Sequence, residues 1–181
     1  MNEESKQPFL TDIKTLRARA RQHIEKGAVT ENYQGDRKTV LKLLNEALAT
    51  EIVCILRYKR HYFMASGLNG PAAAAEFLEH AEEEQEHADS ICKRIQQLEG
   101  EPNLSPDGLL SRSHSEYIEG ENLKDMITED LIAERIAIES YTEMIHYIGD
   151  KDSTTRRLLE SILEVEEEHA NDMSDLLKHY K

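Results

Sequence analysis

Residues 84–87 read Glu84-Gln85-Glu86-His87, and the same spacing recurs in Glu166-Glu167-Glu168-His169. On an α-helix, residues three apart lie on one face, so each quartet sets a carboxylate beside an imidazole. The spacing alone is weak evidence, because Glu143-Met144-Ile145-His146 shares it. That third quartet lies off the apolar stripe of its predicted helix and is expected at the surface, whereas the first two interrupt their stripes.

Apolar residues repeat at helical spacing in four long segments, at about 36–66, 71–100, 121–148 and 153–180. No segment alternates with period two for long enough to predict a strand. Short turns join the first pair and the last pair, which makes each pair an antiparallel hairpin. Residues 100–120 form a much longer connection. The sequence therefore predicts an all-α fold, a four-helix bundle of two antiparallel hairpins joined by a long crossover.

Each predicted helix carries one glutamate inside its apolar stripe. An unpaired buried carboxylate costs several kcal/mol, and four in one core also repel one another. The stripes contain no Lys or Arg, so two divalent cations are the simplest source of neutralising charge. Four carboxylates and two imidazoles suit iron or manganese better than a thiolate-binding ion. The candidate ligands are Glu51, Glu84, His87, Glu134, Glu166 and His169.

An internal repeat adds two tyrosines to this pattern. Tyr58 follows Glu51 by seven residues, and Tyr141 follows Glu134 by the same interval. Two helical turns separate each pair, so both hairpins offer the same groups on the same face. Either tyrosine could donate a hydrogen bond to a ligand carboxylate, and the alternative is that both simply fill the core.

The overall charge favours cationic partners. The chain has 181 residues, with 22 Lys and Arg against 36 Asp and Glu, and a formal net charge of −14. Such a chain repels nucleic acid and attracts cations. No apolar run approaches the roughly 18 residues of a membrane span, and no secretory signal follows Met1. We therefore expect a cytoplasmic protein without membrane partners.

The first 35 residues are predicted to form a separate extension, followed by the bundle domain at 36–181. A short helix is expected from Thr11 to Lys26, followed by a linker from Gly27 to Gly35. Residues 1–38 carry eight basic and six acidic side chains, a balance of only +2. We therefore expect this helix to pack on the protein rather than to bind DNA.

Three further side chains leave alternatives open. Cys54 and Cys92 lie on the helices that carry Glu51 and His87, so they are either redox-active neighbours of the metals or inert thiols. His80, one turn before Glu84, is expected at the surface, with a transient iron site as the alternative.

Three stretches resemble a known family. The first, Leu43-Leu44-Asn45-Glu46-Ala47-Leu48-Ala49-Thr50-Glu51, looks like the opening of its first helix. Residues 84–89 and Leu98-Glu99-Gly100-Glu101-Pro102-Asn103-Leu104 look like its second helix and the start of its crossover. Over roughly residues 36–180 the chain resembles the bacterioferritin branch of the ferritin-like superfamily.

The resemblance implies a ferroxidase that oxidises Fe²⁺ with oxygen or peroxide and stores Fe³⁺ in a hollow homo-oligomeric shell. It implies two iron ions per subunit, with manganese as an alternative. Each ion has its own glutamate and histidine, and two glutamates bridge the pair. The separate pairs are Glu51 with His87 and Glu134 with His169, and the bridges are Glu84 and Glu166.

Two departures from the bacterioferritin pattern change what we expect for haem binding and for the number of subunits in the shell. Bacterioferritins bind haem through a Met directly after the bridging glutamate of the second helix, where this chain has Gln85, so we expect no haem there. Their fifth helix has no counterpart after His169, which favours a shell of 12 subunits similar to the Dps-like miniferritins. Rival readings are a rubrerythrin-like di-metal peroxidase or catalase, and a Dps-like DNA-protecting protein.

Overall fold

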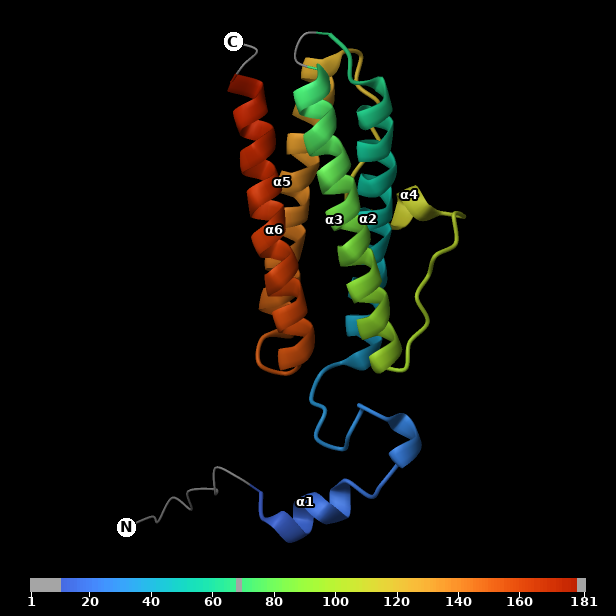
Figure 1. Ribbon diagram of the computed structural model, residues 1–181. Helices are drawn as coiled ribbons and strands as arrows, with labels where there is room; N and C mark the ends of the chain where they lie inside the picture. The colour runs from blue at the N-terminus through green and yellow to red at the C-terminus, as the bar shows by residue number, and fades with distance from the viewer. Residues whose placement is uncertain (1–10, 68–69, 179–181) are drawn as a thin grey trace, which may run out of the picture.

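The computed structural model describes residues 11–67 and 70–178, and four long helices dominate it (Figure 1). These helices lie side by side as a bundle, and no strand occurs within the described residues. They are α2 (Arg37–Met64), α3 (Gly70–Gln97), α5 (Leu123–Ile148) and α6 (Ser153–Lys178). Three short helical pieces accompany them, namely α1 (Ile13–Arg19), η1 (Ile24–Lys26) and α4 (Leu109–Arg112).

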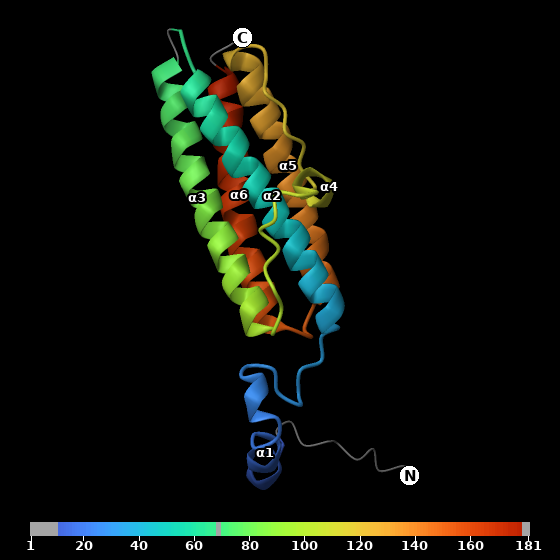
Figure 2. The ribbon, with the colours of Figure 1, turned by 90° about the vertical axis from the view of Figure 1, so that its right-hand side faces the viewer.

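The two predicted hairpins are α2 with α3 and α5 with α6. The crossover between them runs back along α2 and carries α4 on its way (Figure 2). Four α2 side chains hold it at successive heights through hydrogen bonds to crossover backbone atoms or side chains. These side chains are Asn45, Thr50, Arg57 and Arg60. The predicted all-α bundle of two hairpins and one long crossover is confirmed.

Local capping explains where the helices begin and end. The Asp36 side chain accepts a hydrogen bond from the Thr39 amide at the start of α2, and Asn122 caps α5 in the same way. Gly149, with φ of +51°, ends α5 in a conformation that glycine adopts freely. The predicted turn residues 68–69 and the predicted helix end at Tyr180 lie outside the described residues.

The apolar core forms two clusters along the bundle axis, and the stripe glutamates lie between them. One cluster fills the end of the bundle near the α5–α6 turn, and the other fills the opposite end. A polar layer is therefore enclosed by apolar side chains on both sides. The first cluster includes Leu44, Leu48, Ile91 and Ile162, and the second includes Tyr58, Phe77, Ile127 and Met173.

The N-terminal segment differs from the expectation of one helix at 11–26. The helix α1 ends at Arg19, and His23 takes a left-handed conformation with φ of +49° before the short η1 turn. No residue of α1 is buried, and α1 lies beyond one end of the bundle (Figures 1 and 2). The predicted linker does pack, because Val29 and Tyr33 contact the first core cluster.

None of the helices in the described part of the chain combines the length and apolar character that crossing a bilayer requires.

Candidate metal centre

The six candidate ligands meet in the middle of the bundle. One comes from α2, two from α3, one from α5 and two from α6. Their spacing explains this convergence, because each sits on the helix face that packs inward against the other helices. All six are buried, with His87 the most exposed at 8%. They are Glu51, Glu84, His87, Glu134, Glu166 and His169.

The first half of the centre surrounds the Nδ1 atom of His87. This nitrogen lies 3.4 Å from Glu51 Oε2, 3.5 Å from Glu84 Oε2 and 3.2 Å from Glu166 Oε1. The four residues offer ligand atoms that all lie within 4.8 Å of one another.

The second half repeats this arrangement around the Nδ1 atom of His169. Glu84 Oε1 lies 3.7 Å away, and Glu134 Oε2 and Glu166 Oε2 each lie 3.8 Å away. Glu84 and Glu166 therefore turn one oxygen toward each histidine, and the two halves share them.

The six residues leave polar atoms unsatisfied among themselves, and their separations suit two bound cations. Each of the six has a buried polar atom without a hydrogen-bond partner in the described residues. Two ligands at about 2.1 Å from a shared ion are at most about 4.2 Å apart, so the separations around both histidines suit an ion between nitrogen and oxygen. Buried polar atoms are normally satisfied, and one cation in each half would satisfy this set.

Charges in the metal-free centre are strongly perturbed. Burial, together with the nearby charges of Glu134 and Glu51, raises the pKa of Glu166 to about 8. Burial opposes ionisation of Glu134 too, but the neighbouring His169 and the hydrogen bond from Tyr58 prevail and lower its pKa to about 2. Burial disfavours charge on His87, yet three carboxylates raise its pKa to about 12. The metal-free centre thus holds protons, which cations must displace.

Each of the two tyrosines contacts a ligand carboxylate on the opposite hairpin. The hydroxyl of Tyr58 on α2 donates to Glu134 on α5, and that of Tyr141 on α5 donates to Glu51 on α2. Each hydrogen bond occupies one carboxylate oxygen and leaves the other facing a histidine. The partners therefore lie on the opposite hairpin, which ties the two halves of the bundle together.

His80 is buried rather than at the surface, contrary to expectation. It is 1% exposed, its ring stacks on His169 at 3.9 Å between centroids, and its Nδ1 lies 3.2 Å from the Tyr58 hydroxyl. The Nε2 atom of His169 donates to Glu83 across 2.7 Å, which orients the ring. The sequence signal was available, because His80 lies four residues before Glu84 on the same helix face.

A second buried polar group lies beside the centre and was missed from the sequence. Arg57 is 1% exposed, and its Nε donates to Asp130 Oδ1 across 2.8 Å. The other oxygen of Asp130 is 2.8 Å from His61 Nδ1. Arg57 is a buried basic residue of α2, and its guanidinium is paired with Asp130 rather than with a ligand of the six-residue centre.

The glutamate and the histidine of the third Glu-x-x-His quartet, Glu143 and His146, lie at the surface of α5, as predicted. Cys54 is buried and Cys92 half-buried, and both are free thiols. Burial raises the pKa of Cys54 well above its usual range.

Comparison with known proteins shows which proteins this chain is similar to. A model of the ferritin-like domain matches residues 41–181. A bacterioferritin of Desulfovibrio desulfuricans is 28% identical over 148 residues, covering 81% of this chain and 79% of that protein. A Mycobacterium tuberculosis bacterioferritin is 34% identical over 137 residues, covering 75% of this chain and 81% of that protein.

Solved structures of other proteins share the fold of this chain. A dodecameric thioferritin, the bacterioferritin-related protein of Bacteroides fragilis, superposes with a TM-score of 0.78 at 32% identity and covers 81% of this chain and 89% of that one. A Dps of Thermosynechococcus elongatus shares the fold, with a TM-score of 0.74 at 21% identity, covering 77% of this chain and 90% of that one. Because the family model spans more than three quarters of the sequence, the chain belongs to the ferritin-like domain family.

Proposed function

We propose that the protein is a ferroxidase that takes two Fe²⁺ ions as substrate in the six-residue centre. One observation carries the proposal: two overlapping groups of buried carboxylates and imidazoles turn unpartnered atoms toward one another. Each Fe²⁺ would lose one electron. Hydrogen peroxide would accept both and, with two protons, yield two water molecules; dioxygen would accept both and, with two protons, yield hydrogen peroxide.

The chain's own residues would position the ions and balance their charge. Four carboxylates neutralise two divalent ions, and both imidazoles bind through Nδ1, the atom that faces the glutamates. Tyr58 and Tyr141 would hold the outer oxygens of Glu134 and Glu51, so that the remaining oxygens point inward. Manganese, which accepts the same ligands, is the alternative ion.

We further propose that the ions are stored or detoxified in a hollow shell of about 12 copies. This rests on the bacterioferritin relatives and on the dodecameric Bacteroides fragilis protein. Haem plays no part in the proposal, because Gln85 stands where bacterioferritins bind haem through a Met and has no thioether sulfur to offer.

Stopped-flow absorbance after anaerobic loading with Fe²⁺ tests the proposal. Wild type should oxidise two Fe²⁺ per subunit rapidly on mixing with oxygen or peroxide. Glu84→Ala removes a bridging carboxylate and should abolish this fast phase, whereas Glu86→Ala, two residues along α3 and exposed, should retain it. Equal rates in Glu84→Ala and wild type would contradict the centre.

The amount of iron retained separates storage from a peroxidase. Aerobic loading followed by gel filtration should leave many iron ions per subunit in a large particle. Retention of two ions per subunit in a small oligomer would instead favour a di-metal peroxidase or catalase.

A further inference from the structure

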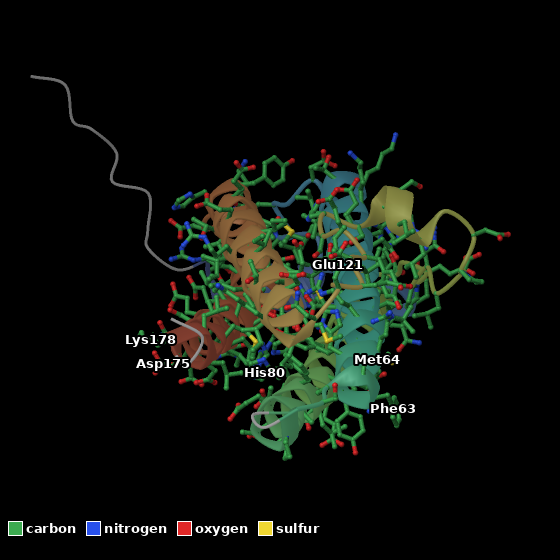
Figure 3. All side chains as sticks on the ribbon, turned by 90° about the horizontal axis from the view of Figure 1, so that it is seen from above. Phe63, Met64, His80, Glu121, Asp175 and Lys178 are labelled. Atoms are coloured by element: carbon green, nitrogen blue, oxygen red, sulfur yellow. The ribbon has the colours of Figure 1, made fainter. Side chains whose placement is uncertain are left out.

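Beside the centre, three side chains from two helices face one another. Glu76 and His80 lie one turn apart on α3, and Asp172 lies opposite them on α6. Their ligand atoms all lie within 4.8 Å of one another. Figure 3 shows the bundle from above relative to Figure 1, with His80 labelled between α3 and α6. None of the three belongs to the proposed di-iron centre.

The buried imidazole points its free nitrogen at the two carboxylates. His80 Nε2 lies 3.6 Å from Asp172 Oδ2 and 4.0 Å from Glu76 Oε2, and it makes no hydrogen bond within the described residues. These separations exceed a hydrogen bond but remain below the roughly 4.2 Å limit for two ligands of one ion. The Glu76 and Asp172 side chains are 38% and 53% exposed, so solvent and ions can reach them.

The hydrogen bonds on the other side of the ring determine its tautomer. Tyr58 has one hydroxyl hydrogen, which it donates to Glu134, so its oxygen can only accept from His80 Nδ1. In a neutral His80 the proton therefore lies on Nδ1, and the Nε2 lone pair faces Glu76 and Asp172. One nitrogen lone pair and two carboxylates that face one another are ligands that a divalent cation accepts.

We propose that Glu76, His80 and Asp172 form a third divalent-cation site, open to solvent and adjacent to the second half of the centre. One nitrogen and two carboxylates carry a charge of −2 when ionised, and water would complete the coordination. The inner neighbours are Glu134 and His169, which share another group of ligand atoms with His80 within 4.8 Å. That the ion is Fe²⁺ moving inward rests on the proposed function, whereas cation binding itself does not.

Zn²⁺ binding to the metal-free full chain tests the site without any oxidation step. Equilibrium dialysis should give three Zn²⁺ per subunit for wild type and two for Glu76→Gln/Asp172→Asn. These two carboxylates are better targets than His80, whose hydrogen bond to Tyr58 reaches the centre. The control Glu86→Gln/Glu168→Gln makes the same charge change at exposed positions of the same two helices and should keep three.

Anomalous diffraction from wild-type crystals soaked in Zn²⁺ locates each ion. We expect a peak about 2.0–2.2 Å from His80 Nε2. No peak there, or three ions retained by the Glu76→Gln/Asp172→Asn variant, would overturn the third site. Two ions confined to the six-residue centre would leave the proposed function standing, whereas an ion at His80 with an empty centre would contradict that function and support this site.

Discussion

At the scale of single residues, the centre is organised by hydrogen bonds that cross between hairpins. Tyr58 and Glu134 are 76 positions apart, and Tyr141 and Glu51 are 90 apart. Each tyrosine orients a carboxylate on the other hairpin, in line with the internal two-fold repeat, and Tyr58 additionally accepts a hydrogen bond from His80. Outer partners of this kind tune metal affinity without contacting the ion.

Removing either hydroxyl should weaken cation binding in the six-residue centre. Tyr58→Phe and Tyr141→Phe should each lower Zn²⁺ affinity by about 10–100-fold, the range seen when outer partners of metal ligands are lost. Competition with a chelator measures this. Tyr147→Phe, on the exposed surface of α5, should bind as wild type does. Unchanged affinity in both tyrosine variants would show that these residues only fill the core.

The buried charges predict how pH affects the metal-free protein. The pKa of Glu166 rises from 4.5 to about 8, and that of His87 rises from 6.5 to about 12. A raised folded pKa contributes stability that is complete below the unfolded pKa and is lost as pH rises through the folded pKa. Thermal unfolding with a chelator present should therefore show stability falling from pH 6.5 to 8.5.

Bound Zn²⁺ should reverse that trend. Ligands must be deprotonated to bind, so cation affinity, and with it the stability of the loaded protein, increases with pH. Unfolding temperatures measured over the same pH range with excess Zn²⁺ should rise. A metal-free protein that gains stability between pH 6.5 and 8.5 would show that the centre is not protonated in the way described.

At the scale of elements, the crossover is fastened to α2 by side chains of very different exposure. Arg57 is buried, pairs with Asp130 and donates to the Ser115 hydroxyl and the Glu116 carbonyl. One turn later, Arg60 reaches Glu119, whose side chain is 63% exposed. Arg57 therefore joins α2, α5 and the crossover, while the half-buried Arg60 joins only α2 and the crossover.

This difference predicts unequal effects of two similar substitutions. Arg57→Ala leaves Asp130 buried with only His61 as partner and should lower the free energy of unfolding by about 3–5 kcal/mol. Arg60→Ala removes a surface pair worth at most about 1 kcal/mol. Urea unfolding measures both. Hydrogen exchange of residues 113–119 should accelerate in Arg57→Ala first, and equal stability of the two variants would contradict the anchoring role.

At the scale of the whole molecule, the acidic charge has two roles. Four of the 36 acidic residues form the centre, where cations would neutralise them. Most others lie on exposed faces, where negative charge raises the local concentration of cations. The basic α1 segment stands apart from this body and buries none of its residues.

The proposed shell predicts a large particle. Twelve copies of the 20.8 kDa chain form an assembly of about 250 kDa, which size-exclusion chromatography with light scattering resolves from a monomer or a dimer. Loading with Fe²⁺ should raise its mass without changing the number of subunits. A monodisperse monomer or dimer would contradict storage in a shell.

The sequence by itself determined the four long helices and the face that each turns inward, because hydrophobic periodicity and capping act within a few residues. The inward placement of Glu51, Glu84, Glu134 and Glu166 follows from that periodicity, and so does the exposure of Glu143. The sequence did not predict the break in the helix expected from Thr11 to Lys26. That segment buries no apolar stripe, so hydrophobic periodicity could not locate the end of the helix.

Only the tertiary structure decided which groups face one another across the bundle. His80 is buried because α6 lays His169 over its ring, and Arg57 is buried because Asp130 and the crossover close around it. The tyrosines cross to the opposite hairpin for the same reason. These contacts join residues dozens of positions apart, so they depend on how the helices pack, which local periodicity does not encode.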